Sequence, residues 1–278
     1  MSERNDYPPG VPCWVDTLQP DPQAAVRFYG DLMGWAFEGP GAMPGDPPGQ
    51  YSVARLRGRD VAGVGSQPSQ PSAGAMPTVW NTYVRIESAD ATARKVKSAG
   101  GRVLREAFDA LPAGRLAVFA DPAGAVFCGW EPVDRQGAQL VNENGAWAMS
   151  VLNTPDPEGS KAFYRAVFGW TADAMKMNGG EITLFRLPGY VGGEPQQPVP
   201  RDNVAVMAPA KPGGPSGNAP PHWLVNFWVV DADGTAEKTK KLGGRILAPP
   251  FDIPGFREAI LADPQGAVFS VAQLKRTG

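Results

Sequence analysis

The 278-residue chain contains one histidine, two cysteines and no excess of basic residues. Its 26 Lys and Arg against 28 Asp and Glu give a formal net charge of −2 and no basic footprint, so we do not expect nucleic acid as a partner. No apolar run approaches the roughly 20 residues of a membrane-spanning helix, and the first residues, 1–6, contain no apolar signal core. Two cysteines cannot form a disulfide framework, so we expect Cys13 and Cys128 to be reduced thiols of a cytoplasmic protein.

An internal repeat organises the chain. The segment Phe28–Trp35 returns as Phe163–Trp170, and Asp121–Phe127 returns as Asp263–Phe269. An Asp-Pro pair recurs before the first landmark, and a Gly-Gly-Arg triplet recurs between the two, so the order is the same in both halves. Residues 132–144 are polar without clear periodicity, which is typical of a linker. The repeat therefore predicts a first domain at 8–131, the linker at 132–144 and a second domain at 145–274.

Each repeat contains the same unit twice, a strand followed by a helix and three further strands. Asp21 is a good helix N-cap, Pro22 suits the first helical position and Gly34 suits the C-terminal cap, so we expect a helix from Pro22 to about Met33. Helices are also predicted at about 90–99, 157–168 and 233–242. The segments 39–49, 66–77 and 192–221 are rich in Pro, Gly and Ser and are predicted loops, either lids or simple connections.

This paired βαβββ unit resembles the building block of the glyoxalase/bleomycin-resistance/dioxygenase (vicinal oxygen chelate) superfamily. The motifs that carry the resemblance are Asp-Pro before a helix ending in Phe-Tyr, then Gly-Trp, and later Gly-Gly-Arg and Asp-Pro-x-Gly-x-Val-Phe. The resemblance implies an α+β fold of two tandem domains, each a curved eight-stranded mixed sheet with helices on its outer face. The concave side of each sheet would be a cup that holds a small ligand. Because the covalent tandem can supply the pairing that single-domain relatives obtain by dimerising, we expect a monomer or a weak homodimer.

The positions that hold a divalent metal in many relatives carry other residues here. Where the resemblance implies His on the first strand, His on the fifth and Glu on the last, the first repeat has Trp14, Asn81 and Cys128. The second repeat has Met149, Leu224 and Ser270. A hard or borderline divalent ion prefers carboxylate or imidazole ligands. We therefore expect no metal site and no other cofactor.

Strand alternation assigns residues to the concave faces, because side chains alternate across a strand. Leu224, Asn226 and Trp228 fall on one face, whereas the intervening residues of that strand are uniformly apolar, as a helix-covered face should be. The candidate ligand-binding residues are Trp14, Asn81, Tyr83, Arg85, Cys128 and Trp130 in the first repeat and Trp147, Met149, His222, Leu224, Asn226, Trp228 and Ser270 in the second.

The chemistry of the predicted cups leaves several alternatives open. An apolar concave surface with a few polar groups suits a small planar or aromatic ligand, although the aromatic residues could instead fill the cups or the domain contact. His222 and Asp16 are weak candidates for a general base. Asp16 shares its face with Arg85, and we favour an ion pair between them over a role in orienting a ligand.

Three functions are compatible with these observations. The first is a metal-independent protein that binds or sequesters an aromatic or natural-product-like small molecule, as in antibiotic resistance or biosynthesis. The second is an enzyme of the same fold, a lyase, an isomerase or a hydroxylase-associated protein, in natural-product or aldehyde metabolism. The third is a protein with filled cups that works through partner contacts. We favour the first, with a small-molecule partner and neither nucleic acid nor a membrane.

Overall fold

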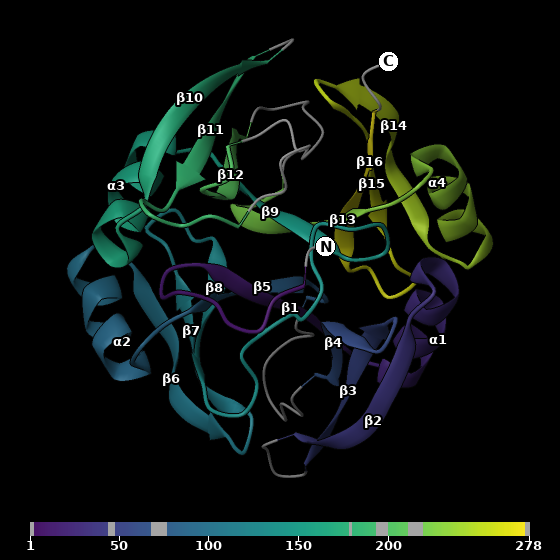
Figure 1. The fold of residues 1–278 in the computed structure, drawn as a ribbon, viewed down its shortest axis with the longest axis horizontal. Helices are drawn as coiled ribbons and strands as arrows, with labels where there is room; N and C mark the ends of the chain where they lie inside the picture. The colour runs from purple at the N-terminus through teal and green to yellow at the C-terminus, as the bar shows by residue number, and fades with distance from the viewer. Residues whose placement is uncertain are drawn as a thin grey trace.

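Two curved eight-stranded sheets form the protein in a computed structural model that describes residues 3–43, 48–67, 77–177, 180–192, 200–210 and 219–275 (Figure 1). The first sheet has the order β2-β3-β4-β1-β5-β8-β7-β6, and the second has the order β10-β11-β12-β9-β13-β16-β15-β14. Each mixes parallel and antiparallel pairs. The elements of the first half are β1 (Pro12–Gln19), α1 (Pro22–Met33), β2 (Ala36–Met43), β3 (Gly49–Leu56), β4 (Arg59–Ser66), β5 (Trp80–Arg85), α2 (Ala89–Ser98), β6 (Arg102–Ala110), β7 (Gly114–Ala120) and β8 (Val126–Pro132).

The second half repeats this order, which confirms the predicted α+β fold with two βαβββ units in each sheet. Its elements are β9 (Trp147–Thr154), α3 (Pro157–Phe168), β10 (Thr171–Met177), β11 (Gly180–Arg186), β12 (Asn203–Pro209), β13 (His222–Trp228), α4 (Ala232–Lys241), β14 (Arg245–Ile253), β15 (Phe256–Ala262) and β16 (Val268–Leu274).

Local sequence sets the ends of the first helix of each sheet. The Asp21 side chain accepts a hydrogen bond from the Ala24 backbone N–H at the start of α1, and Pro22 follows at the first helical position. Gly34 ends α1 in the left-handed conformation at φ 75°, which glycine adopts without a steric penalty. Helix α3 begins and ends in the same way. None of the helices among the described residues is long and apolar enough to cross a membrane.

The predicted loops were partly wrong. Strand β12 lies inside the predicted loop 192–221, and β2 continues to Met43, inside the predicted loop 39–49. The prolines and glycines around these strands are typical of loops, so the local sequence did not predict them. Strand formation there depends on pairing with other strands: β12 pairs with β11 on one side and β9 on the other. The parts of the predicted loops at 44–47, 68–76, 193–199 and 211–218 lie outside the described residues, so a role as lids stays a prediction.

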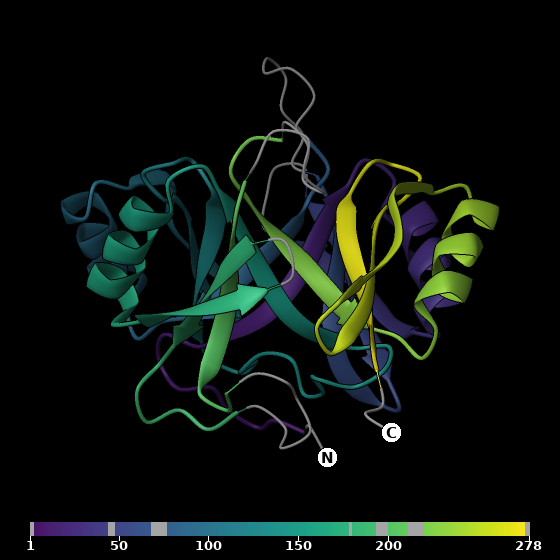
Figure 2. The same ribbon diagram turned by 90° about the horizontal axis from the view of Figure 1, so that it is seen from above.

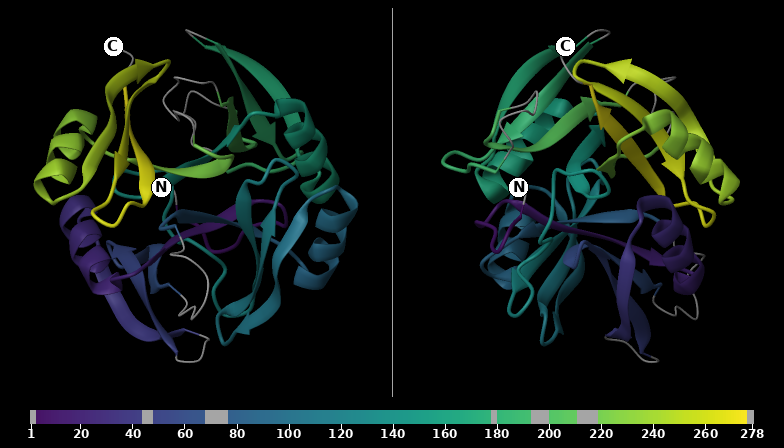
Figure 3. Two further views of the ribbon diagram at one scale, coloured as in Figure 1. Left: turned by 180° about the vertical axis from the view of Figure 1, so that it is seen from behind. Right: turned by 45° about the vertical axis from the view of Figure 1, so that its right-hand side comes forward.

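The two sheets pack back to back, and their concave sides open in opposite directions (Figures 1 and 3). Helix α1 contacts α4 on one flank and α2 contacts α3 on the other (Figure 2). The apolar core follows this pairing, since each of its two clusters contains residues of both sheets. The Phe227 ring of β13, for example, lies 5.0 Å from the Trp80 ring of β5 and 5.5 Å from the Trp35 ring. The outer face of each sheet is therefore covered by helices and by the other sheet.

The repeated Phe-Tyr and Asp-Pro motifs join the two halves. The Tyr29 hydroxyl donates to Asp263 Oδ2 at 2.9 Å and accepts from Trp80 Nε1 at 2.9 Å. The symmetry-related Tyr164 hydroxyl donates to Asp121 Oδ2 at 3.2 Å. All five side chains are buried, so these bonds satisfy polar groups that burial would otherwise destabilise. The landmarks that define the repeat in the sequence thus stabilise the contact between the halves.

The connection between the sheets is part of the core. Ala138, Leu140 and Val141 are buried, and the Ala138 N–H donates to the Cys13 carbonyl at 2.8 Å. The Tyr7 hydroxyl donates to the Ala138 carbonyl at 2.6 Å. The same connection reaches the second sheet, where the Gly145 N–H donates to the Trp228 carbonyl at 2.7 Å.

Candidate functional site

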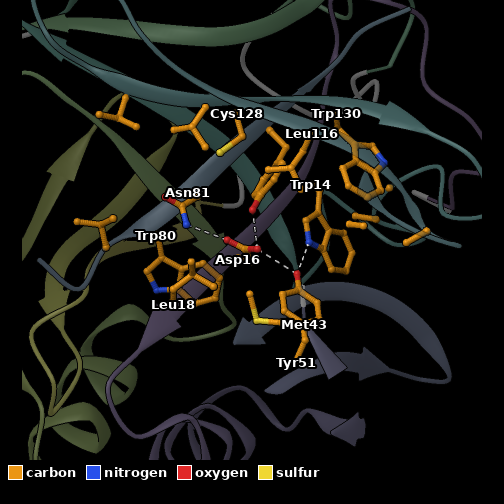
Figure 4. A pocket seen from close by; sticks show the side chains of 18 of the residues that line it. Trp14, Asp16, Leu18, Met43, Tyr51, Trp80, Asn81, Leu116, Cys128 and Trp130 are labelled. Carbon is orange, nitrogen blue, oxygen red and sulfur yellow. Dashed lines mark hydrogen bonds between the residues drawn. The ribbon is translucent and has the colours of Figure 1, made fainter. Parts of the chain in front are cut away.

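Asp16 lies at the centre of the concave face of the first sheet. Strand β1 places it between Trp14 and Leu18 on this face, with its side chain 2% exposed. Three neutral groups donate to its carboxylate: the Tyr83 hydroxyl at 2.7 Å, the Asn81 amide at 2.9 Å and the Tyr51 hydroxyl at 3.1 Å (Figure 4). Asn81 and Tyr83 were predicted to face this cup, and both point their polar atoms at its central carboxyl group.

Tyr51 was missed by the sequence analysis, and two glycines explain how it reaches the centre. A Cβ atom at Gly63 would lie 1.9 Å from the Tyr51 hydroxyl oxygen, and one at Gly65 would lie 2.8 Å from its ring. Gly63 is paired with Asp16 across β1 and β4, so the space above it leads directly to the carboxylate. The Tyr51 hydroxyl also accepts from Trp14 Nε1 at 2.9 Å. The alternating glycines of β4 were the available signal for an overlying aromatic ring.

Burial raises the pKa of Asp16 above its ordinary value of 3.8, and the hydrogen bonds from Asn81, Tyr83 and Tyr51 oppose this change. The expected ion pair with Arg85 is not formed among the described residues. Arg85 pairs with Val11 at the far end of β5, whereas Asp16 pairs with Asn81 at the other end, so the two side chains are too distant. Nor does Arg85 line the cavity above Asp16. Within the described part of the chain, Asp16 is therefore a carboxyl group without a cationic partner.

Apolar and aromatic side chains surround this carboxyl group. Leu116 and Val118 on β7 lie beside Trp130 and Cys128 on β8, and the Trp130 and Tyr83 rings meet edge to face at 6.4 Å. The cavity that they line has a volume of about 2080 Å³ and extends to residues of the second sheet, among them Leu224 of β13 and Ile260 of β15. Ligand pockets usually measure roughly 300–1,000 Å³, so this cavity is an open cup that could admit a molecule of several rings. Among the described residues, five exposed large apolar side chains line this cup: Val79, Leu104, Leu111, Val126 and Leu247.

Three residues with nucleophilic or basic side chains have no catalytic arrangement. Cys13 and Cys128 are free, as predicted, and burial raises the pKa of each thiol, which makes both poor nucleophiles. His222 lines the outer part of the cavity, where its Nδ1 atom is 2.7 Å from the Pro220 carbonyl oxygen. This hydrogen bond of the imidazole joins it to the loop before β13 and not to a carboxylate.

The concave face of the second sheet also carries a carboxyl group, which the sequence analysis did not identify. Asn226 on β13 pairs with Ser270 on β16, and its amide nitrogen donates to the Ser270 hydroxyl at 2.7 Å and to Glu258 Oε1 at 3.3 Å. Glu258 comes from β15, and burial raises its pKa to about 7. Local sequence patterns could not identify Glu258 as a site residue, because only the pairing of β13, β16 and β15 brings it close to Asn226 and Ser270.

One predicted residue of the second cup lies elsewhere. Met149 pairs with Asn226, but the register between β9 and β13 shifts at the next position, and Trp147 pairs with Phe227. Since directly paired residues share a face, Trp147 points with Phe227 into the core between the sheets, where it is 5% exposed. The simple alternation used for Trp147 failed at this irregularity. Leu224, Asn226 and Trp228 remain on the concave face.

The side chains present do not fit a divalent metal ion. The expected ligand positions hold an indole, an amide and a thiol in the first cup and a thioether, an isobutyl group and a hydroxyl in the second. No group of three or more His, Cys, Asp and Glu residues that could hold a metal occurs in the described part of the chain. Asp16 and Glu258 each stand alone among neutral donors, whereas these metals require several carboxylate, imidazole or thiolate ligands.

Paired βαβββ units with a cup on each concave face define a two-domain protein of the vicinal oxygen chelate fold, as the sequence motifs predicted. The sequence profile of the glyoxalase-like domain matches residues 14–129 and again 136–272, so the chain belongs to the glyoxalase-like domain family.

Relatives and solved structures agree with this assignment. The chain is 40% identical to "Putative glyoxylase CFP32" of Mycobacterium tuberculosis over 98% of this chain and 97% of that protein. It is 33% identical to "Anthracycline biosynthesis protein DauV" of Streptomyces sp. strain C5 over 97% and 95%. Among solved structures, the Mn(II)-bound glyoxalase from Novosphingobium aromaticivorans is 17% identical with a TM-score of 0.59, covering 96% of this chain and 83% of that one. At this identity the structural likeness shows the fold alone.

Proposed function

We propose that the first cup binds a planar, hydroxylated aromatic molecule without a metal ion, and that the protein carries or sequesters this molecule. The observation that supports the proposal is the state of Asp16. A carboxylate has about four acceptor positions, and Tyr51, Asn81 and Tyr83 occupy three of them. A ligand hydroxyl would donate to the free position on Oδ1 and give this buried group its fourth partner.

The side chains that line the cup favour a flat aromatic ring system in the rest of the ligand. Trp14 and Trp130 are half-buried, so parts of both indoles stay available for stacking against a flat ring. Leu116 and Met43 add apolar contacts (Figure 4). Anthracyclines, after whose biosynthesis one relative is named, are fused-ring hydroxylated aromatic compounds, and such a molecule suits a wide aromatic cup with one buried acceptor. The back-to-back packing of the sheets already covers their outer faces, and we propose a monomer.

Binding of a hydroxyanthraquinone, compared with the parent anthraquinone, tests this proposal. Affinities would be measured from the probe's absorbance for the full-length protein, for Asp16→Asn and for Glu258→Gln, a matched removal of the carboxyl charge in the other cup. We expect Asp16→Asn to weaken binding of the hydroxylated probe by about ten-fold or more, because hydrogen bonds to charged groups contribute roughly 1.5–3 kcal/mol. Anthraquinone itself should respond little, and Glu258→Gln should leave both affinities unchanged.

Three outcomes would contradict the proposal. Asp16→Asn could bind both probes as the unchanged protein does, Glu258→Gln could be the variant that loses binding, or a chelator could abolish binding and so reveal a metal requirement. Mass spectrometry of the recovered probe separates carriage from the enzyme alternative, in which Asp16 would accept a proton from the substrate. An unchanged probe supports binding alone, and a converted one supports the enzyme.

A further inference from the structure

The second cup has a different chemistry from the first. Two rows of paired residues cross its concave face on β13, β16 and β15. The row nearest the end of β13 is Trp228, Ala272 and Glu258, and the next is Asn226, Ser270 and Ile260. Ala272 and Ser270 are small, so the middle strand leaves room between the larger side chains on either side.

Glu258 has no cationic partner on this face. Its hydrogen bonds are with the neutral groups of Asn226 and Ser270, and no ion pair joins it to a Lys, Arg or His side chain of the described residues. The adjacent Arg257 points to the other side of β15, where it pairs with Asp233 and Asp252. An uncompensated carboxylate in a partly apolar setting favours a ligand that brings a positive charge.

Two aromatic rings lie beside this carboxyl group. The Trp228 and Phe256 ring centres are 5.9 Å apart with a tilt of 45°, and Phe256 shares the face of Glu258 two positions along β15. Both side chains are half-buried and so remain partly available. Aromatic faces attract cations through their quadrupole, and the attraction increases where water is excluded.

We propose that the second cup is a separate site for a small organic cation, a protonated primary amine on an aromatic or alkyl group, held by Glu258 with Trp228 and Phe256. The ammonium group donates to the Glu258 carboxylate and to the Ser270 hydroxyl, while its substituent packs over Ala272 and against the two rings. This site is separate from the one proposed for the first cup, because none of Glu258, Trp228, Phe256 and Ser270 lines the cavity above Asp16 and the concave sides of the two sheets face opposite ways (Figure 3).

Calorimetric titration of the full-length protein with benzylamine, and with the neutral isostere benzyl alcohol, tests this inference. We expect benzylamine to bind with saturation. The affinity of benzyl alcohol should be lower by a factor of about ten or more, because only the amine forms a charge-assisted hydrogen bond. Glu258→Gln should weaken benzylamine to the level of the alcohol. Trp228→Leu should weaken it about three-fold or more through the lost ring.

Asp16→Asn is the matched control, since it removes the carboxyl charge of the first cup and should leave benzylamine binding unchanged. The inference is overturned if benzylamine does not saturate, if Glu258→Gln binds it as well as the unchanged protein, or if Asp16→Asn is the variant that loses it. Failure here leaves the hydroxyanthraquinone experiment unaffected, and the two proposals can therefore fail separately.

Discussion

Replacing Glu258 with Gln should stabilise the protein at pH 8 and have little effect at pH 4. Burial raises the pKa of this side chain from the ordinary 4.5 to about 7, so the folded protein holds its proton more tightly than the unfolded chain does. Below pH 4.5 both states are protonated and no penalty exists. Between pH 4.5 and 7 the unfolded chain ionises first and stability falls, and above pH 7 the loss is complete.

The size of this effect follows from the same two values. One pKa unit corresponds to about 1.4 kcal/mol, so ionised Glu258 lowers the free energy of unfolding by up to about 3 kcal/mol at pH 8. Gln keeps an oxygen that can accept from the Asn226 amide, and it has no charge to lose. The stability of the variant relative to the unchanged protein should therefore rise from near zero at pH 4 to its maximum above pH 7.

Urea denaturation between pH 4 and pH 8, followed by circular dichroism, measures this difference. Glu237→Gln on the exposed face of α4 removes the same charge without a buried environment and should give a small, nearly constant difference. If the Glu258→Gln difference did not grow with pH, or if the variant were less stable at pH 8, the carboxyl group would not be buried and uncompensated as described.

Two further predictions concern the first cup and the contact between the halves. Gly63→Ala should destabilise the protein by roughly 1–3 kcal/mol, because the new methyl group would overlap the Tyr51 side chain. Gly41→Ala is the control, because a Cβ atom there would make only an ordinary contact, 3.9 Å from the Tyr51 carbonyl oxygen. Equal chemical denaturation midpoints for the two variants would disprove the overlap. Tyr164→Phe should cost about 1–3 kcal/mol, because it leaves the buried Asp121 carboxylate short of a donor; an unchanged melting temperature would show that this bond contributes nothing.

Local signals in the sequence were sufficient for the helices and for the tandem architecture. Asp21, Pro22 and Gly34 specify the ends of α1 through short-range capping, and the same residue types recur before and after α3. Alternation placed Asn81 and Tyr83 on the concave face because β5 pairs with β1 without interruption over that stretch. Residue identity alone showed that the positions that hold a metal in many relatives carry neither imidazole nor carboxylate side chains here.

The tertiary structure decided which side chains meet. Tyr51 reaches Asp16 only because β4 presents Gly63 beneath it, and Glu258 reaches Asn226 only because β16 lies between their strands with a small residue. Trp147 points into the core and not into the predicted cup, because the register between β9 and β13 shifts beside it. Capping and alternation are properties of neighbouring residues, so the sequence alone determined them. Contacts across a sheet join residues that are far apart in the chain, so they depend on how the strands pair in the folded protein and could not be predicted from neighbouring residues.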